Sequence, residues 1–164
     1  MKDKEHYILY VLNTEFPEAD IKEDKFVYNR YDAYNNRTII EVKDRDTFYE
    51  NTMIEFDKFS YNLLFAKTIN KTFLYVVKMK NTIYVFNITK MHRLKYDFKW
   101  HWRKLPKSTE FDQSYDVKKF VGYVNIDSCS RKIELLMVKV TNKELGGLKN
   151  LKKTIIEYSK RRKM

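Results

Sequence analysis

Two neighbouring runs of β-branched and aromatic residues constrain the fold of this chain more than any other feature. Thr72–Met79 and Thr82–Ile88 each fit a strand, and a short Lys80–Asn81 turn joins them. The stretch Phe73-Leu74-Tyr75-Val76-Val77 is apolar throughout, so the first strand is apolar on both faces. Such strands are typical of the interior of a sheet that is covered on both sides. We therefore expect these two strands at the centre of an α/β domain.

The elements expected around this centre are helices and shorter strands. Apolar residues recur every three or four positions from Lys4 to Phe16, which predicts an amphipathic helix ended by Pro17. The same spacing predicts a long helix over Thr47–Ile69. Residues 89–119 read as a basic, irregular region. Further elements are expected as strands over Lys119–Ile126 and Ile133–Val140 and, after Gly146-Gly147, as a basic helix over Leu148–Arg162.

The length and the cysteine content limit the class of protein. A chain of 164 residues is one domain's worth of sequence, so we expect a single domain over residues 1–164. No apolar stretch reaches the roughly 20 residues that cross a bilayer, and no signal peptide is visible, which favours a cytoplasmic protein without a membrane partner. One cysteine, Cys129, cannot form an intrachain disulfide, and with three scattered histidines it does not make a conventional zinc site.

The net charge of +11 points towards a polyanionic partner. An A/T-rich coding sequence would also enrich the chain in lysine, asparagine and tyrosine, so the total charge alone leaves both explanations open. The distribution favours a partner, because residues 1–25 carry four basic and seven acidic side chains, whereas residues 142–164 carry eight basic and two acidic ones. Nucleic acid is the partner class that this pattern indicates.

A predicted hairpin brings two carboxylates together. Phe26–Tyr34 and Thr38–Lys43 read as strands joined by a two-residue turn at Asn35-Asn36, since asparagine tolerates the positive φ of such turns. In that register Tyr34 faces Arg37, Asp32 faces Ile39 and Arg30 faces Glu41. Side chains alternate along a strand, so Asp32, Glu41 and Lys43 share one face.

This arrangement suits metal-assisted phosphoryl chemistry. Two carboxylates on rigid strands can hold Mg²⁺, which prefers oxygen ligands and keeps waters that a substrate phosphate can displace. An ammonium such as Lys43 can orient an attacking water or stabilise the charge of the transition state. The alternative is structural, because Arg30 lies opposite Glu41 in the same register and could form a cross-strand ion pair with it.

The segment from Phe26 to Ile88 resembles the core of the PD-(D/E)XK nuclease superfamily. The residues that carry the resemblance are Tyr31-Asp32 and, after eight intervening residues, Glu41-Val42-Lys43, followed by a long helix and two apolar strands. Tyr31 departs from the pattern, which has proline there. The resemblance implies a restriction-endonuclease-like fold, in which a mixed β-sheet is flanked by α-helices. It also implies Asp32 and Glu41 as ligands of Mg²⁺ or Mn²⁺, Lys43 beside the attacking water, the Val42 carbonyl as an extra ligand, and an acid from the first helix, Glu5 or Glu15.

Other residues are candidates for contact with nucleic acid. In such a fold Lys58 would lie next to the site, although an ion pair with Glu55 one helical turn earlier is a simpler explanation for it. Trp100 and Trp102 lie in a basic stretch and could stack on bases, or they could only close the core.

The sequence therefore favours a metal-dependent nuclease that hydrolyses phosphodiester bonds in DNA, of the compact kind found in phages and mobile elements. A homodimer is compatible with this interpretation. The rival hypothesis is a non-catalytic basic module that has the same fold and binds nucleic acid. Whether the substrate is DNA or RNA, and whether cleavage is internal or terminal, is left open by the sequence.

Overall fold

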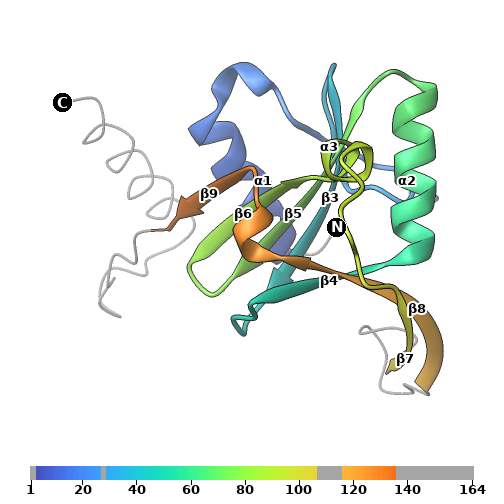
Figure 1. The fold of residues 1–164 in the computed structure, drawn as a ribbon. Helices are drawn as coiled ribbons and strands as arrows, with labels where there is room; N and C mark the ends of the chain where they lie inside the picture. Colours follow the sequence, from blue (N-terminus) through green and yellow to red (C-terminus); the bar gives the residue numbers. More distant parts are fainter. Residues whose placement is uncertain (1–2, 27–28, 107–115, 136–164) are drawn as a thin grey trace, which may run out of the picture.

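A six-stranded mixed sheet forms the centre of the protein (Figure 1). The computed structural model describes residues 3–26, 29–106 and 116–135. Neighbouring strands run antiparallel except for the central pair β3 and β5, which are parallel. The strands lie in the order β1 (Lys22–Glu23), β2 (Ala33–Tyr34), β3 (Thr38–Arg45), β5 (Thr72–Met79), β6 (Thr82–Asn87) and β9 (Arg131–Glu134).

One face of this sheet is covered by helix α1 (Asp3–Glu15), which is followed by the short 3-10 helix η1 (Pro17–Ala19). The periodic apolar residues of α1 pack on the sheet because every second side chain of each strand points towards the helix. Fully or nearly fully buried members of this cluster are Ile8, Leu9, Val11 and Leu12 from α1 and Ile40, Val42, Val76 and Ile83 from the sheet.

The opposite face is covered by α2 (Phe56–Thr68), α3 (Ile88–Arg93) and a second, three-stranded sheet. The second sheet is antiparallel, in the order β4 (Asn51–Glu55), β8 (Asp116–Asn125), β7 (His101–Pro106), and the 3-10 helix η2 (Ile126–Ser128) follows β8. The core here is largely aromatic, and its buried members include Phe59, Phe73, Tyr75, Tyr84, Phe86 and Phe98. The predicted α/β architecture, a mixed sheet flanked by helices, is confirmed.

The prediction of one helix over Thr47–Ile69 is wrong in its first third. Residues 51–55 form β4 instead, and α2 begins only at Phe56. Thr52 and Ile54 are buried while Met53 between them is partly exposed, which is the alternation of a strand. The partner strand β8 lies about seventy residues later in the chain, and this non-local pairing outweighs the helical spacing of the apolar side chains.

The predicted hairpin exists, but its register is shifted. Tyr34 pairs with Ile39 rather than with Arg37, because four residues rather than two lie between the paired positions. The Asn35 carboxamide holds this wider turn by accepting hydrogen bonds from the backbone N–H groups of residues 37 and 38. Pairing moved by two residues, an even number, so every side chain stays on its predicted face. The first strand is also shorter than predicted, since β2 covers only residues 33 and 34.

The remaining expectations have mixed outcomes. The region 89–119 was expected to be irregular, and this is wrong, because it contains most of α3, β7 and the start of β8. The strand predicted from Ile133 is β9, which begins earlier, at Arg131. Its predicted end and the basic helix over Leu148–Arg162 lie outside the described residues. Within the described residues, no helix is long and apolar enough to cross a membrane.

The contact between Gly122 and Trp100 gives a test of this packing. A Cβ atom at position 122 would lie 2.8 Å from the indole ring, and rings on several sides hold that indole in place. We expect Gly122→Ala to lower the free energy of unfolding by about 1–3 kcal/mol through overpacking. Chemical denaturation should measure the loss, and Lys118→Ala, an exposed change on the same strand, should have little effect.

Candidate functional site

A buried carboxylate lies in the middle of the central strand β3. Glu41 is only 1% exposed, and its strand neighbours Ile40 and Val42 are buried apolar residues. It points to the face of the sheet that carries α2, and it lies beside Tyr75 of the parallel strand β5. A charge at such a position is expensive unless cations and hydrogen-bond donors surround it.

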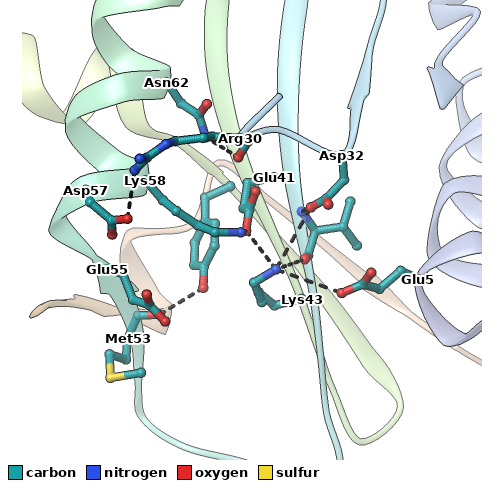
Figure 2. Close-up of polar contacts among 12 residues, drawn as sticks. Glu5, Arg30, Asp32, Glu41, Lys43, Met53, Glu55, Asp57, Lys58 and Asn62 are labelled. Atoms are coloured by element: carbon teal, nitrogen blue, oxygen red, sulfur yellow. Dashed lines mark hydrogen bonds and ion pairs between the residues drawn. The ribbon is translucent and has the colours of Figure 1, made fainter. Parts of the chain in front are cut away.

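Lys43 supplies one of these cations and is itself surrounded by oxygen atoms (Figure 2). Its Nζ lies 2.7 Å from Glu41 Oε1 and 2.7 Å from the carbonyl oxygen of Val42. Two further carboxylate oxygens lie at the edge of contact, Asp32 Oδ2 at 4.0 Å and Glu5 Oε1 on α1 at 3.9 Å. The structure thus places around one ammonium the oxygen donors that the resemblance implied, and of the two candidate acids of the first helix Glu5 is the one that lies near Lys43.

Asp32 is fixed by the backbone of β3. Its carboxylate accepts a hydrogen bond of 2.7 Å from the N–H of Val42, and its own N–H donates to the carbonyl of Ile40. Asp32, which precedes the first residue of β2, therefore extends the hydrogen bonding between β2 and β3 by one residue through its backbone and its side chain. A carboxylate held by a strand in this way has little freedom to rotate away from the site.

Helix α2 contributes a second cation. Lys58 Nζ lies 2.5 Å from Glu41 Oε1, so two lysines share one carboxylate oxygen. The predicted alternative for Lys58, an ion pair with Glu55, is wrong, because Glu55 pairs with Lys119 of β8 at 3.2 Å.

The predicted structural alternative for Glu41, a cross-strand ion pair with Arg30, is wrong as well. Arg30 does not pair with Glu41 but with Asp57 on α2, at 2.8 Å. The register of the hairpin, which differs from the predicted one, removes Arg30 from the position opposite Glu41.

Three further residues lie near the site. Asn62, fully buried one turn after Lys58, donates to the Arg30 carbonyl and so ties α2 to the segment before β2. Tyr75 donates to the Met53 carbonyl and joins β5 to β4. Arg45 lines a small hollow beside the site. The other residues that line this hollow are Glu41, Lys43, Met53, Ile54, Glu55, Lys58 and Tyr75.

The electrostatics of the site have two opposing parts. Burial raises the pKa of the Glu41 carboxyl, and the positive charges of Lys43 and Lys58 only partly offset this effect. Burial would lower the pKa of the Lys43 ammonium, but the carboxylates of Glu41 and Asp32 outweigh it, so that pKa is raised. The lysine therefore stays charged at neutral pH, whereas Glu41 gains a proton more readily than an ordinary glutamate.

The donor atoms fit a hard divalent cation. Asp32, Glu41, Glu5 and the Val42 carbonyl offer only oxygen, which is what Mg²⁺ and Mn²⁺ prefer. Glu41 Oε2 is buried and has no hydrogen-bond partner among the described residues, so the carboxylate has unused capacity to bind a cation. Within the described residues, no group of three or more His, Cys, Asp and Glu side chains is arranged to hold a metal ion. Mg²⁺ needs no such group, because one or two carboxylates suffice when waters and phosphate complete its shell.

The two tryptophans proposed for base stacking lie in different surroundings. Trp100 packs against several aromatic rings, with centroids 5.0 Å from Phe56, 4.9 Å from Phe59 and 5.4 Å from Phe98. Trp102 is 66% exposed. Stacking of a base on either ring stays a prediction, and of the two Trp102 has the more accessible ring.

Comparisons with known proteins give one structural likeness and no match to a family or a curated protein. No family model matches the chain, and no curated protein matches it. One solved structure that it resembles is Archaeoglobus fulgidus Hjc, a Holliday junction resolvase from an archaeal hyperthermophile. The TM-score is 0.47 and the identity is 16%, over 80% of this chain and 92% of that one. A likeness of this degree does not say what this chain binds or does.

The shared carboxylate oxygen gives a pH-dependent prediction. Lys58→Met should destabilise the protein at neutral pH by about 1–3 kcal/mol, because buried Glu41 keeps only one cation. Since the neutral carboxyl needs no cation, the deficit should shrink as the pH falls towards 4.5, the ordinary pKa of a glutamate. Denaturation across this pH range measures it, and Lys67→Met on the exposed surface of α2 is the control. A deficit independent of pH would contradict the role assigned to Lys58.

Proposed function

We propose that this protein is a metal-dependent nuclease that hydrolyses phosphodiester bonds in DNA. In this proposal Asp32 and Glu41 hold Mg²⁺ or Mn²⁺, with Glu5 and the Val42 carbonyl as further oxygen donors, and Lys43 acts on the attacking water. The observation that carries the proposal is the position of Lys43 Nζ among these four oxygen donors. The resemblance of Asp32 and Glu41-Val42-Lys43 to the PD-(D/E)XK pattern supports the same assignment.

The residues of the chain have separate tasks in this reaction. When bound, the divalent cation would supply an acidified water and neutralise charge on the phosphate. Lys43 would orient the nucleophile and stabilise the charge that develops on the phosphoryl oxygens, because its raised pKa keeps it positive. The short bonds from the β3 backbone to Asp32 hold that ligand in place, so that little reorganisation is needed.

Lys58 is proposed to contact the phosphate next to the scissile bond. It lies on the side of Glu41 that faces α2, and its side chain lines the hollow, together with Arg45 and Lys43. A divalent cation at Glu41 would replace the charge that Lys58 now supplies to this carboxylate, which would release the ammonium for a substrate phosphate. The three basic side chains in the hollow are suited to a polyanion.

The rival function is a non-catalytic module that binds nucleic acid with the same fold. The observation that favours it is that Lys43 and Lys58 both pair with Glu41, so the protein itself supplies cations to this carboxylate. The two functions differ in one measurable respect, since only the nuclease requires Asp32 and Lys43 for turnover.

The proposed cleavage of DNA is tested with two variants of the site and two matched control variants. Asp32→Asn and Lys43→Gln should each lower the cleavage rate of labelled DNA with Mg²⁺ or Mn²⁺ by about 100-fold or more, the scale seen when one transition-state contact is lost. The matched controls are Asp44→Asn and Lys78→Gln, which break an ion pair of 2.8 Å between β3 and β5 away from the site. Both controls should keep rates near that of the parent.

Two outcomes would contradict this assignment. If the parent cleaves but Asp32→Asn and Lys43→Gln keep parental rates, the active site lies elsewhere. If the parent cleaves neither DNA nor RNA with either metal, the rival function is the better account. Because Lys43→Gln removes an ion pair from buried Glu41, circular dichroism must show that each variant is folded at the assay temperature.

Metal binding is tested without turnover. Mn²⁺ at 100 times its Kd should stabilise the parent by about 2.7 kcal/mol against unfolding. Asp32→Asn and Glu41→Gln should lose this gain, Lys43→Gln should keep it because a competing cation is removed, and Asp44→Asn should behave as the parent. The raised pKa of Glu41 means that protons compete early, so the gain should decline as the pH falls from neutrality. Equal stabilisation of the parent and Glu41→Gln would refute this metal site.

A further inference from the structure

Strands β7 and β8 form a two-stranded ribbon that extends beyond the six-stranded sheet (Figure 1). Residues directly opposite each other include Trp102 and Phe120, and Lys104 and Lys118. Because side chains alternate along a strand, these four residues share one face of the ribbon. We call them the ribbon face.

The aromatic part of the ribbon face consists of Trp102, which is largely exposed, and Phe120, which is partly buried. Trp102 packs against Phe120 with a centroid distance of 5.2 Å, yet 66% of the residue is exposed. Phe120 in turn stacks with Trp100, which belongs to the core. The indole of Trp102 therefore packs on a continuous set of rings that leads into the core, and the rest of its ring surface is accessible to solvent. Exposed tryptophan supported in this way is suited to stacking on a flat apolar group.

The charged part of the ribbon face is unfavourable for the isolated protein. Lys104 and Lys118 are both exposed and lie directly opposite each other, a placement in which like charges repel. No acidic side chain of the described residues pairs with either lysine. By contrast, Lys119 on the other face of the ribbon pairs with Glu55. An external anion would relieve the repulsion between Lys104 and Lys118.

We infer that the ribbon face binds an unpaired stretch of a DNA strand, with a base on Trp102 and phosphates at Lys104 and Lys118. This inference rests on the proposed function, because it assigns DNA as the polyanion. Positions 102 and 104 lie about 7 Å apart on one face of a strand, so a base and a neighbouring phosphate can be contacted together. A base inside a duplex has both faces covered by its neighbours, whereas an unpaired base can leave the stack and meet the indole.

The inference also gives the ribbon a place in the proposed reaction. The ribbon joins the site through β4, since β8 pairs with β4 and β4 carries Glu55 into the hollow. A substrate that has both paired and unpaired parts would contact the hollow with one part and the ribbon face with the other. The substrate class is therefore DNA with single-stranded segments, such as a flap, an overhang or an open junction.

Tryptophan fluorescence tests the inference without turnover. The chain has two tryptophans, and only Trp102 is on the ribbon face. Titration of full-length protein with a short thymidine oligonucleotide in EDTA should quench the emission in a saturable way. Trp102→Phe should bind with near-parental affinity, measured by anisotropy of a labelled strand, but should show no quenching. Trp102→Leu, which keeps no aromatic ring, should bind about tenfold more weakly.

The lysines are tested by salt dependence with a matched pair of variants. Lys104→Gln with Lys118→Gln should reduce the slope of log affinity against log salt by about 1.4, because two phosphate contacts to a single strand are lost. The control is Lys67→Gln with Lys90→Gln, two lysines on the helices α2 and α3, which should leave the slope unchanged. Tyr10→Leu, an exposed aromatic change on α1, is the control for Trp102→Leu. Thermal unfolding should show that all variants are folded.

Three results would overturn the inference. They are quenching that persists in Trp102→Phe, parental affinity in Trp102→Leu, and equal quenching by a long blunt duplex at the same phosphate concentration. These results do not depend on cleavage, so they are separate from the test of the nuclease. A protein that cleaves DNA but shows no quenching would keep the proposed function and lose the ribbon face.

Discussion

The burial of one carboxylate, Glu41, determines how this site is built. A glutamate that is 1% exposed in the central strand needs compensation, and the structure supplies it from two directions, Lys43 on the same strand and Lys58 on α2. The position of α2 over the sheet is therefore tied to the charge state of the site. Removal of either lysine leaves Glu41 with a single cation, so the stability of the fold depends on the charges at this site.

The two layers on either side of the sheet make this burial possible. Helix α1 covers one face with aliphatic side chains, while α2 and the second sheet cover the other with aromatic ones. The site opens where these layers meet the end of β3, so that Glu41 is buried but Asp32 and Lys43 are in part accessible. A graded exposure of this kind combines a low dielectric around Glu41 with solvent access at Asp32 and Lys43, and charged groups interact more strongly where the dielectric is low.

The predictions that held rest on local patterns, and those that failed depend on distant partners. The strands Thr72–Met79 and β3 follow from continuous β-branched and apolar runs, and the first helix follows from its periodicity. The segment 51–55 reads as helix by spacing and becomes a strand only because β8 pairs with it. The shifted hairpin shows a third case, in which the register was wrong but the face was right, because the error was an even number of residues.

The sequence by itself predicted that Asp32, Glu41 and Lys43 share one face of a hairpin, because side chains alternate along each strand and a register shift of two residues leaves that face unchanged. The resemblance to the PD-(D/E)XK core implied an acid from the first helix, for which the sequence offered Glu5 and Glu15 without a choice between them. Only the tertiary structure decided that Glu5 is the one near Lys43, that Lys58 pairs with Glu41, and that Glu55 pairs with Lys119. These partners lie on different elements, and the distance between two side chains there depends on how helices and sheets pack. Local periodicity determines which face of a helix or strand a side chain occupies, whereas the packing of helices and sheets determines which residues that side chain contacts.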